Sequence, residues 1–427
     1  MTVHWLILIS AAVLLAVLGI WLWPRIMKTR ILVAAYGDAQ EKMILNELVR
    51  DFNKKQSHVQ ASTQWFPYDV FTREVQKAVQ RGVGPDVVVL DAAHYPDFVF
   101  DGFLEPLNTS FMTDMLDIDD FYPQVVGRFY QDGYLYAVPR DAAPICLVYY
   151  NKRAFDEAGV PYPRDDWDWN KFVETAKRVM KVDASGRVEC WGFIEGWSMM
   201  EGWVYDAGGS YVDDIKCPTR WTLAEDRDSL KGLEFRRDLI HKHKVMPPPD
   251  VWSGVNDTDS MEMFVAGKAA MVLWGLWKTP RFREIRDFQW DVALIPRTPL
   301  GHLDFSMVGS GYGIPSGSKF KDAAWRFVKY ASGEEGSKKL AVDGLSQPAR
   351  MKIANSEVFL DQKDPRNKKI VLGVMKHGKY SPICRNWSEV KAIIERGFGP
   401  VWEGKITVEE ALERLKPILE KNPPVTQ

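Results

Sequence analysis

Cysteine is scarce in this chain, and the four that are present, Cys146, Cys190, Cys217 and Cys384, lie far apart. No two of them form a C-x-x-C pair, so the sequence indicates neither a zinc site nor a thioredoxin-like redox site. We expect structural thiols, or one disulfide between Cys190 and Cys217.

Recognisable catalytic motifs are also missing. The chain has no G-x-S-x-G, H-E-x-x-H or Walker loop, and Gly309-Ser-Gly-Tyr-Gly313 lacks the spacing of a dinucleotide site. Asp165, Asp166 and Asp168 could act as general acid and base, but they precede a helical pattern, and N-capping explains them. His241-Lys-His243 has no carboxylate or cysteine at ligand spacing. The sequence therefore predicts no catalysis, no metal and no cofactor.

An excess of charge of either sign is absent as well. The chain has 55 Lys and Arg against 57 Asp and Glu, which gives a net charge of -2. A nucleic-acid-binding protein would need a clustered basic surface, so DNA and RNA are excluded as partners. With 427 residues, of which 46% are hydrophobic and 26% charged, the chain is expected to form two or three packed domains.

One long hydrophobic run is present, the 19 uncharged residues Trp5–Trp23. As a helix with a rise of about 1.5 Å per residue, it is long enough to cross about 30 Å of hydrocarbon. No basic n-region precedes it and no small-x-small site precedes Pro24, so an uncleaved anchor is favoured over a cleaved signal peptide. Arg25, Lys28 and Arg30 follow the run, and by the positive-inside rule alone they would hold the rest of the chain in the cytoplasm.

From Ile31 onward, strand and helix patterns alternate. Ile31–Ala35 predicts a strand, and Asp38-Ala-Gln-Glu41 resembles a capping box at the start of a helix. Val59–Trp65 predicts a second strand, and Val87–Leu90 a short buried strand of the kind found in parallel sheets. The order of these segments predicts parallel βαβ units and the α/β class. Further elements are expected at 145–150, 290–295, 309–314 and 320–330.

Aromatic residues stand out at the ends of these elements, in a chain with 17 Trp and 15 Tyr. An aromatic ring can stack against the flat apolar face of a sugar. Asp and Arg side chains near the carboxyl ends of strands, where open α/β sheets bind ligands, could hydrogen-bond to sugar hydroxyls. We therefore predict a ligand cleft lined by Tyr36, Asp91, Asp141, Trp197, Trp274, Trp277, Tyr312, Arg350 and Trp387.

Four blocks of the sequence point to a known family. They are Gly84-Pro-Asp-Val-Val-Val-Leu-Asp91, Asp132-Gly-Tyr-Leu-Tyr-Ala-Val-Pro139, Phe264-Val-Ala-Gly-Lys-Ala-Ala-Met271 and Gly344-Leu-Ser-Gln-Pro-Ala-Arg350. Together they resemble the extracytoplasmic solute-binding proteins of ABC sugar importers, family 1, which includes maltose-binding and glycerol-phosphate-binding members. The resemblance runs from about Ile31 to the end of the chain.

The resemblance implies the type II periplasmic-binding-protein-like fold, in which two α/β lobes bind a ligand between them and close by hinge bending. We place 31–139 plus 292–330 in lobe 1 and 140–291 plus 331–427 in lobe 2. We expect residues 1–30 to form an N-terminal membrane helix or signal segment.

The resemblance also implies roles for site residues. Trp277 and Trp387 match positions that stack on sugars, Trp197 matches an aromatic residue of the second lobe, and Arg350 matches a polar contact of some members. Tyr36, Asp91 and Asp141 are predicted from their places in loops.

The expected function is to bind a carbohydrate or polyol, as a monomer, and to deliver it to ABC permease subunits in the membrane. The expected location is the extracytoplasmic face of the cytoplasmic membrane, on the periplasmic side, where the solute arrives and where the N-terminal helix would anchor the protein. Two alternatives remain open. A membrane-tethered sugar sensor would recruit a signalling partner, and a glycoside hydrolase would turn the sugar over.

Overall fold

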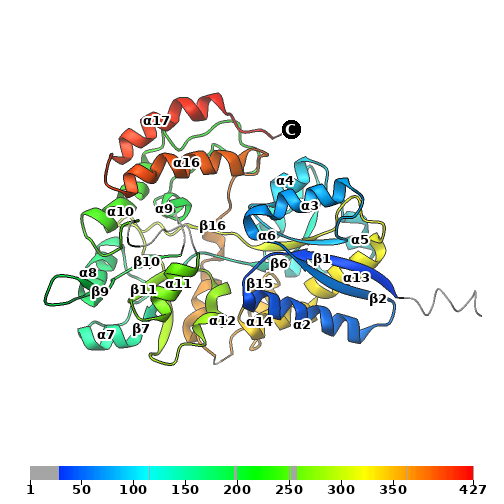
Figure 1. The fold of residues 1–427 in the computed structure, drawn as a ribbon, viewed down its shortest axis with the longest axis horizontal. Coiled ribbons are helices and arrows are strands. Elements are labelled where there is room, and N and C mark those ends of the chain that lie inside the picture. The colour runs from blue at the N-terminus through cyan, green and yellow to red at the C-terminus, as the bar shows by residue number, and fades with distance from the viewer. Residues whose placement is uncertain are drawn as a thin grey trace, which may run out of the picture.

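Two main sheets organise the computed structural model, and they occupy separate halves of the molecule (Figure 1). The first lies on the right of that view and the second on the left. The predicted two-lobed α/β fold is thereby confirmed. The structure describes residues 28–114, 116–196, 200–249, 251, 257–361 and 363–426.

The N-terminal hydrophobic run, Trp5–Trp23, lies outside the described residues. Among the helices of the described part, none is both long and apolar enough to cross a membrane.

The first sheet has six strands. Across the sheet they are β15 (Gln347–Pro348), β6 (Ala137–Ala142), β14 (Ser310–Gly313), β3 (Val87–Asp91), β1 (Thr29–Ala35) and β2 (Val59–Trp65). β1 pairs in parallel with β2 and β3, as the βαβ prediction requires. β14 pairs antiparallel with both β3 and β6. Residues 87–90 are fully buried, which is the environment expected for a strand inside a sheet covered on both faces.

The second sheet has four strands. Across the sheet they are β10 (Ile194–Glu195), β11 (Met271–Trp274), β7 (Leu147–Asn151) and β12 (Trp290–Leu294). β7 pairs antiparallel with β11 and β12, while β10 runs parallel to β11. The chain therefore passes from one sheet to the other between β6 and β7, and passes back between β12 and β14.

The described residues also form three pairs of short strands. They are β4 (Tyr130–Gln131) with β5 (Tyr134–Leu135), β8 (Lys181–Val182) with β9 (Val188–Cys190), and β13 (Phe305–Ser306) with β16 (Gly378–Lys379).

Helices flank each sheet within its own half of the molecule (Figure 1). Beside the first sheet lie α2 (Ala39–Lys55), α3 (Phe71–Gln80), α4 (Tyr95–Phe100), α5 (Asn108–Thr113), α6 (Pro123–Arg128), α13 (Lys321–Ser332), α14 (Glu334–Asp343), α15 (Met351–Ala354) and the 3₁₀ helices η1 (Tyr68–Val70) and η2 (Ile118–Asp120).

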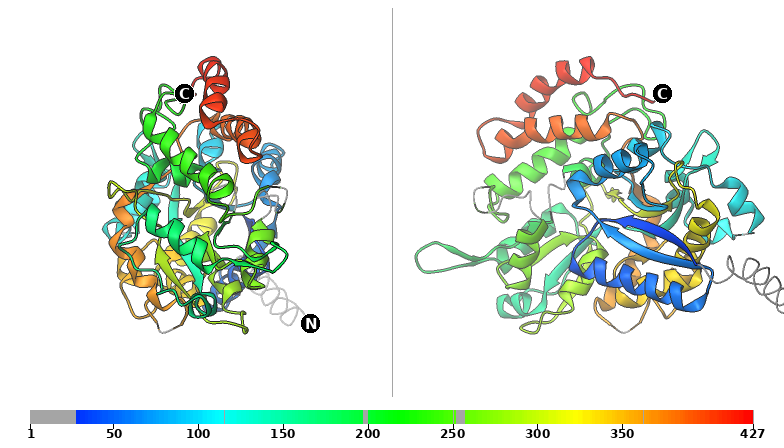
Figure 2. Two further views of the ribbon diagram at one scale, coloured as in Figure 1. Left: turned by 90° about the vertical axis from the view of Figure 1, so that its left-hand side faces the viewer. Right: turned by 45° about the vertical axis from the view of Figure 1, so that its right-hand side comes forward.

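The half with the second sheet carries the remaining helices. They are α7 (Lys152–Ala158), α8 (Trp169–Val179), α9 (Met200–Asp206), α10 (Arg227–His241), α11 (Asp257–Val265), α12 (Thr279–Phe282), α16 (Trp387–Trp402), α17 (Val408–Lys421) and the 3₁₀ helices η3 (Leu276–Lys278), η4 (Arg366–Gly373) and η5 (Met375–His377). Figures 1 and 2 show α16 and α17 stacked beyond α10, and both helices contact it.

Helix α2 shows how the local sequence sets an element that matters for the site. Its N-cap is Asp38, whose Oδ1 accepts the backbone N–H of Glu41 at 3.0 Å. The capping box suggested by the sequence is only half formed, because the Glu41 carboxylate accepts a hydrogen bond from Arg140 instead of returning to the cap. The apolar face of α2 includes Ile44 and Leu48, one turn apart and both buried.

The residue limits of the two lobes stay a prediction. Strand β6 continues through Pro139, where we placed the first crossing, to Ala142, and β12 continues through Asp291 to Leu294. Both strands are therefore hydrogen-bonded to a sheet at the predicted limits, and the loops that cross between the sheets begin after them.

All four cysteines are free thiols, so no disulfide joins Cys190 and Cys217. Cys217 is exposed and the other three are buried. Burial raises the pKa of the Cys190 thiol to about 11 and that of Cys384 to about 12, which keeps both protonated and unreactive near neutral pH.

Candidate functional site

Several predicted site residues meet at one edge of the first sheet. Tyr36 directly follows β1 and Asp91 ends β3, and because these strands are parallel their carboxyl ends lie together. Ser310, the first residue of β14, pairs with Asp91 on one side and with Asp141 of β6 on the other. The antiparallel strands thus bring Asp141 to the same edge.

Tyr36 lies in a cluster of aromatic rings. Its ring centroid is 5.1 Å from that of Tyr68, 4.9 Å from Phe71 and 5.2 Å from His94. Burial raises the pKa of the Tyr36 hydroxyl well above its ordinary value, and the nearby Asp91 carboxylate raises it further. The hydroxyl therefore stays neutral.

Asp91 accepts several hydrogen bonds. Tyr68 Oη donates to Oδ2 at 2.7 Å, and the backbone N–H groups of Ala93 and His94 donate to Oδ1 at 3.0 and 2.8 Å. His94 Nδ1 lies 2.9 Å from the same oxygen. Burial by itself would raise the pKa of Asp91, but His94 and these donors outweigh it and hold the pKa well below its ordinary value. The pKa of His94 is raised, because its carboxylate neighbour outweighs the effect of burial.

Asp141 and Arg140 form a second polar cluster beside the first. Asp141 accepts the backbone N–H of Ser310 at 2.8 Å and its hydroxyl at 2.7 Å. Arg140 Nη2 donates to Glu41 at 2.5 Å, which ties α2 to β6. Burial raises the pKa of Glu41 and of Asp141, and Arg140 opposes the shift in both cases. Burial also raises the pKa of the neighbouring Tyr312 to about 12.

The second lobe contributes Trp274, Trp277 and Lys278. Trp274 ends β11 and is fully buried beside Gly196, where an added Cβ would lie 2.7 Å from the indole. Trp277 covers Gly275 so closely that a Cβ there would lie 1.7 Å from its ring. The ring of Trp277 is half-buried.

Two contacts then connect these residues to the first lobe. Lys278 Nζ lies 3.3 Å from Asp38 Oδ2 at the start of α2. Trp277 packs against a small apolar cluster of Ile44, Leu340 and Leu345. We call the place where the two halves meet the inter-lobe junction, and define it by Tyr36, Asp38, Glu41, Asp91, Arg140, Asp141, Trp277 and Lys278.

The remaining predicted residues are placed differently. Trp387 begins α16 with 1% of its surface exposed and packs against Tyr211 and Trp221, which is a core position. Arg350 donates to Asp120 at 2.9 Å and to the carbonyl of Ser332 at 2.8 Å, and both partners lie beside the first sheet. Trp197 lies outside the described residues. Binding roles for these three residues stay predictions.

Sequence reasoning missed four charged residues of the junction. Asp38 and Glu41 were recognised only as the start of a helix, although they also place two carboxylates at the edge of the sheet. Lys278 directly follows Trp277 in the sequence, and Arg140 directly precedes Asp141. Their position next to residues already selected was the available signal.

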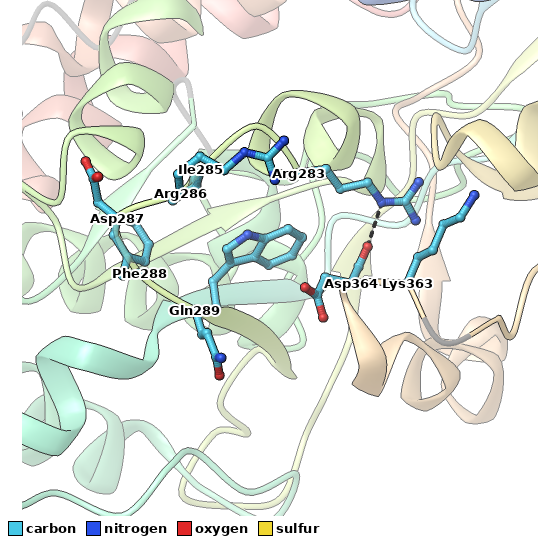
Figure 3. Close-up of a pocket in the computed structure, with 9 residues that line it drawn as sticks. Arg283, Ile285, Arg286, Asp287, Phe288, Gln289, Lys363 and Asp364 are labelled. Atoms are coloured by element: carbon cyan, nitrogen blue, oxygen red, sulfur yellow. Dashed lines mark hydrogen bonds between the residues drawn. The ribbon is translucent and has the colours of Figure 1, made fainter.

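Two cavities lie away from the junction. The larger has a volume of about 640 Å³ and lies beside the start of β12 (Figure 3). The residues that line it are Arg283, Ile285, Arg286, Asp287, Phe288, Gln289, Trp290, Lys363 and Asp364. Arg283 Nε donates to the Asp364 carbonyl there at 2.8 Å. The second, of about 490 Å³, lies between α10 and the segment that leads into α17. Neither is lined by a predicted site residue.

One of the three carboxylates that could suggest catalysis, Asp168, has a structural role. Asp168 is the N-cap of α8 and accepts the backbone N–H of Lys171 at 2.8 Å, as predicted. In the part of the chain that the structure describes, no three His, Cys, Asp or Glu side chains are grouped so that they could hold a metal ion.

Comparisons with known proteins identify the family and the fold of the chain. Residues 37–338 match the family model described as bacterial extracellular solute-binding protein. An arabinooligosaccharide-binding protein of Halalkalibacterium halodurans is 24% identical over 315 residues, which cover 70% of this chain and 66% of that protein.

Two solved structures share the fold. A substrate-binding protein of an ABC transporter from Listeria monocytogenes, in complex with cycloalternan, has a TM-score of 0.82 at 24% identity, covering 93% of this chain and 99% of its own. UgpB from Mycobacterium tuberculosis, in complex with glycerophosphocholine, has a TM-score of 0.77 at 19% identity. The match covers 92% of this chain and 98% of UgpB. The family match spans most of the chain, and the chain therefore belongs to the bacterial extracellular solute-binding proteins.

Proposed function

We propose that this protein binds a carbohydrate or related polyol between its two lobes, outside the cytoplasmic membrane, and delivers it to the permease of an ABC transporter. The observation that carries the proposal is the inter-lobe junction, where Lys278 pairs with the Asp38 carboxylate of α2 and Trp277 packs against Ile44 of the same helix. The relatives named for an arabinooligosaccharide and for cycloalternan support a saccharide as the ligand.

The chemistry of the junction suits such a ligand. Trp277 offers an indole face, and Asp91 and Asp141 offer carboxylate oxygens that can accept hydrogen bonds from hydroxyl groups. Each hydrogen bond to a charged group contributes roughly 1.5–3 kcal/mol in a desolvated site. Binding of this kind requires no covalent chemistry, and a monomer that closes around its ligand can present one surface to the permease.

The first prediction is that the purified full chain binds a saccharide or polyol and releases it unchanged. A ligand that binds only the folded state raises the melting temperature, so a thermal-shift screen against saccharides, polyols and glycerol phosphodiesters should identify it. Calorimetry should then give one site per chain, and chromatography should recover the intact ligand. A cleaved product would contradict this function and support a glycoside hydrolase.

The second prediction concerns the N-terminus. Long domains translocate largely regardless of nearby charge, so Arg25, Lys28 and Arg30 do not fix the cytoplasmic orientation. We expect Trp5–Trp23 to remain in the mature protein as an anchor, with the lobes on the extracytoplasmic side. Protease added to intact spheroplasts should digest the lobes, and mass spectrometry should find the mature N-terminus before Trp23. Full protection of the lobes would refute this location, and an N-terminus near Ile31 would indicate a cleaved signal peptide.

A further inference from the structure

Two segments that cross between the sheets run side by side. One follows β6, and the other follows β12 and contains β13. The N–H of Ile145 donates to the carbonyl of Ser306 at 2.9 Å, and that of Val308 to the carbonyl of Ala143 at 3.1 Å. At its other edge β13 pairs in parallel with β16, which lies between the two halves of the molecule in Figure 1. We call these three stretches, 143–146, 304–308 and 377–379, the hinge ribbon.

Charged side chains connect β16 to β13. Asp304 directly precedes β13, and its Oδ1 lies 3.2 Å from Nδ1 of His377, which directly precedes β16. Its Oδ2 lies 3.7 Å from Nζ of Lys379, the last residue of β16. Lys376, next to His377 in η5, is exposed. The carboxylate of Asp304 is therefore the centre of the attraction between the two strands.

Helix α9 contacts β13 and ends in a buried acid, Asp206. The residue is 0% exposed. Trp169 Nε1 donates to its Oδ2 at 2.7 Å, whereas its Oδ1 has no hydrogen-bond partner among the described residues. An ionised Asp206 would leave a charged oxygen buried without a donor, which costs far more free energy than burying a neutral carboxyl group.

Burial and a neighbouring carboxylate both oppose the ionisation of Asp206. Burial raises the pKa of Asp206 well above its ordinary value, the hydrogen bond from Trp169 lowers it, and the charge of Asp304 raises it further. Arg297, on the loop after β12, also lowers this pKa, but its guanidinium donates to the Gly301 carbonyl at 3.4 Å. The favoured form of Asp206 is therefore the neutral acid.

Two further titratable groups lie near the end of α9. His302 and Asp228 both come to 4.0 Å from the position that a Cβ on Gly208 would take. Asp228 is engaged by Lys231, whose Nζ donates to it at 2.7 Å. Protonation of His302 or of His377 adds positive charge on the side of Asp304. Proton uptake by these histidines and by Asp206 therefore acts in the same direction.

We propose that Asp206 is a proton-dependent latch of the hinge: while its carboxyl group is neutral, α9 stays packed against β13, and its ionisation loosens the hinge ribbon. Ionisation would place a second negative charge beside Asp304 in a buried site, where like charges repel more strongly than in water. The charge regains water only if α9 moves away from β13. The latch goes beyond the proposed function, because it acts without a ligand.

The direction of the pH effect follows from the raised pKa of Asp206. The folded state keeps the proton to a higher pH than the unfolded state does. The stability that this provides is complete below the ordinary pKa of aspartate, and it is lost as the pH rises through the raised value. The hinge ribbon is therefore expected to be firm in acid and to loosen in alkali.

The variant Asp206→Asn isolates the charge. Asparagine has nearly the same shape, and its amide oxygen can accept the hydrogen bond from Trp169, but it cannot ionise. Asp120→Asn is the matched control, because Asp120 is also buried but forms an ion pair with Arg350 at 2.9 Å. Loss of that pair should lower the melting temperature at every pH and leave the shape of the pH profile unchanged.

The first measurement follows the melting temperature of the full chain from about pH 5 to about pH 9. Toward the alkaline end, the wild type should lose at least about 4 °C more than Asp206→Asn does. The infrared difference spectrum between the wild type and Asp206→Asn should show the carbonyl stretch of a protonated carboxyl group in acid. This band should disappear over the same pH range in which the melting temperature falls.

Hydrogen exchange then tests the hinge itself. The N–H of Met307 donates to the Lys379 carbonyl at 2.7 Å, so it is protected while the ribbon is intact. At about pH 9 we expect the peptide that contains Met307 and Val308 to exchange roughly tenfold faster in the wild type than in Asp206→Asn. In acid the two proteins should exchange equally. Comparison at equal pH removes the intrinsic dependence of exchange on pH.

Each part of the latch has its own contrary result. A carboxyl band that is absent in acid, or that persists at the alkaline end, would refute the proton step. Equal exchange of the two proteins after the band has disappeared would show that Asp206 ionises without loosening the ribbon, which also refutes the latch. Should Asp206→Asn not fold, Trp169→Phe provides a second test. It removes the donor that lowers the pKa of Asp206, so the band and the melting temperature should both persist to higher pH. No shift, or a shift to lower pH, would overturn the proposal.

Discussion

Replacing Arg236 by methionine is expected to lower the free energy of unfolding by about 3–5 kcal/mol. Its partner Glu195 is fully buried in the second sheet, and one of its oxygens accepts hydrogen bonds from Arg236 Nε at 2.7 Å and from Nη2. Trp203 donates to the other oxygen at 2.9 Å, and the ring of Trp402 lies 3.9 Å from the guanidinium. Without Arg236, a carboxylate remains in an apolar core with its charge uncompensated.

Denaturant unfolding followed by tryptophan fluorescence measures this effect. Lys171→Met is the control, because Lys171 and Glu174 form an exposed ion pair at 3.0 Å, with 56% and 55% of their side chains accessible. Losing such a pair should change stability by no more than about 1 kcal/mol. Glu195→Gln combined with Arg236→Met should recover part of the loss, because the double variant has no buried charge. Equal effects of Arg236→Met and Lys171→Met would show that the buried pair contributes little.

The sequence predicts the sheets well because each strand carries its own signal. The continuous apolar residues of β3 and the alternation with helices from Ile31 onward depend on local pattern, and the parallel pairing of β1 follows from them. The N-cap at Asp38 is equally local. The antiparallel insertion of β14 between β3 and β6 is not a local feature, because it joins residues that are more than 150 positions apart in the sequence.

The site was harder to predict because burial of a side chain depends on its tertiary partners. Trp277 and Trp387 look alike in sequence, each near glycine or charge, yet Trp277 is half-buried at the junction and Trp387 packs between Tyr211 and Trp221. Arg350 was selected from its loop, but Asp120, which engages it, lies 230 residues away. Long-range pairing therefore decides which polar residues are available to a ligand.

Replacing Trp277 by alanine is expected to weaken ligand binding by about 1–3 kcal/mol, a factor of roughly 5 to 150 in Kd. The ring covers Gly275, so its orientation is fixed by a close contact with the backbone. It also touches Ile44, Leu340 and Leu345, which lie on the side of the first sheet. Truncation would therefore remove both a stacking surface and an apolar contact that favours lobe closure. Calorimetry with the ligand found in the screen measures the change.

Two further variants separate stacking from a general loss of packing. Trp277→Phe keeps an aromatic face, so it should retain most of the affinity if stacking dominates. Trp169→Ala removes another half-buried tryptophan, whose ring stacks between α8 and α10 on Phe235 with centroids 4.0 Å apart. It should lower the melting temperature without changing Kd. Unchanged affinity in a folded Trp277→Ala protein would refute the stacking role. A drop in melting temperature with no change in Kd would place Trp277 among the core residues, because only a residue that contacts the ligand or the closed state can alter binding once the fold is intact.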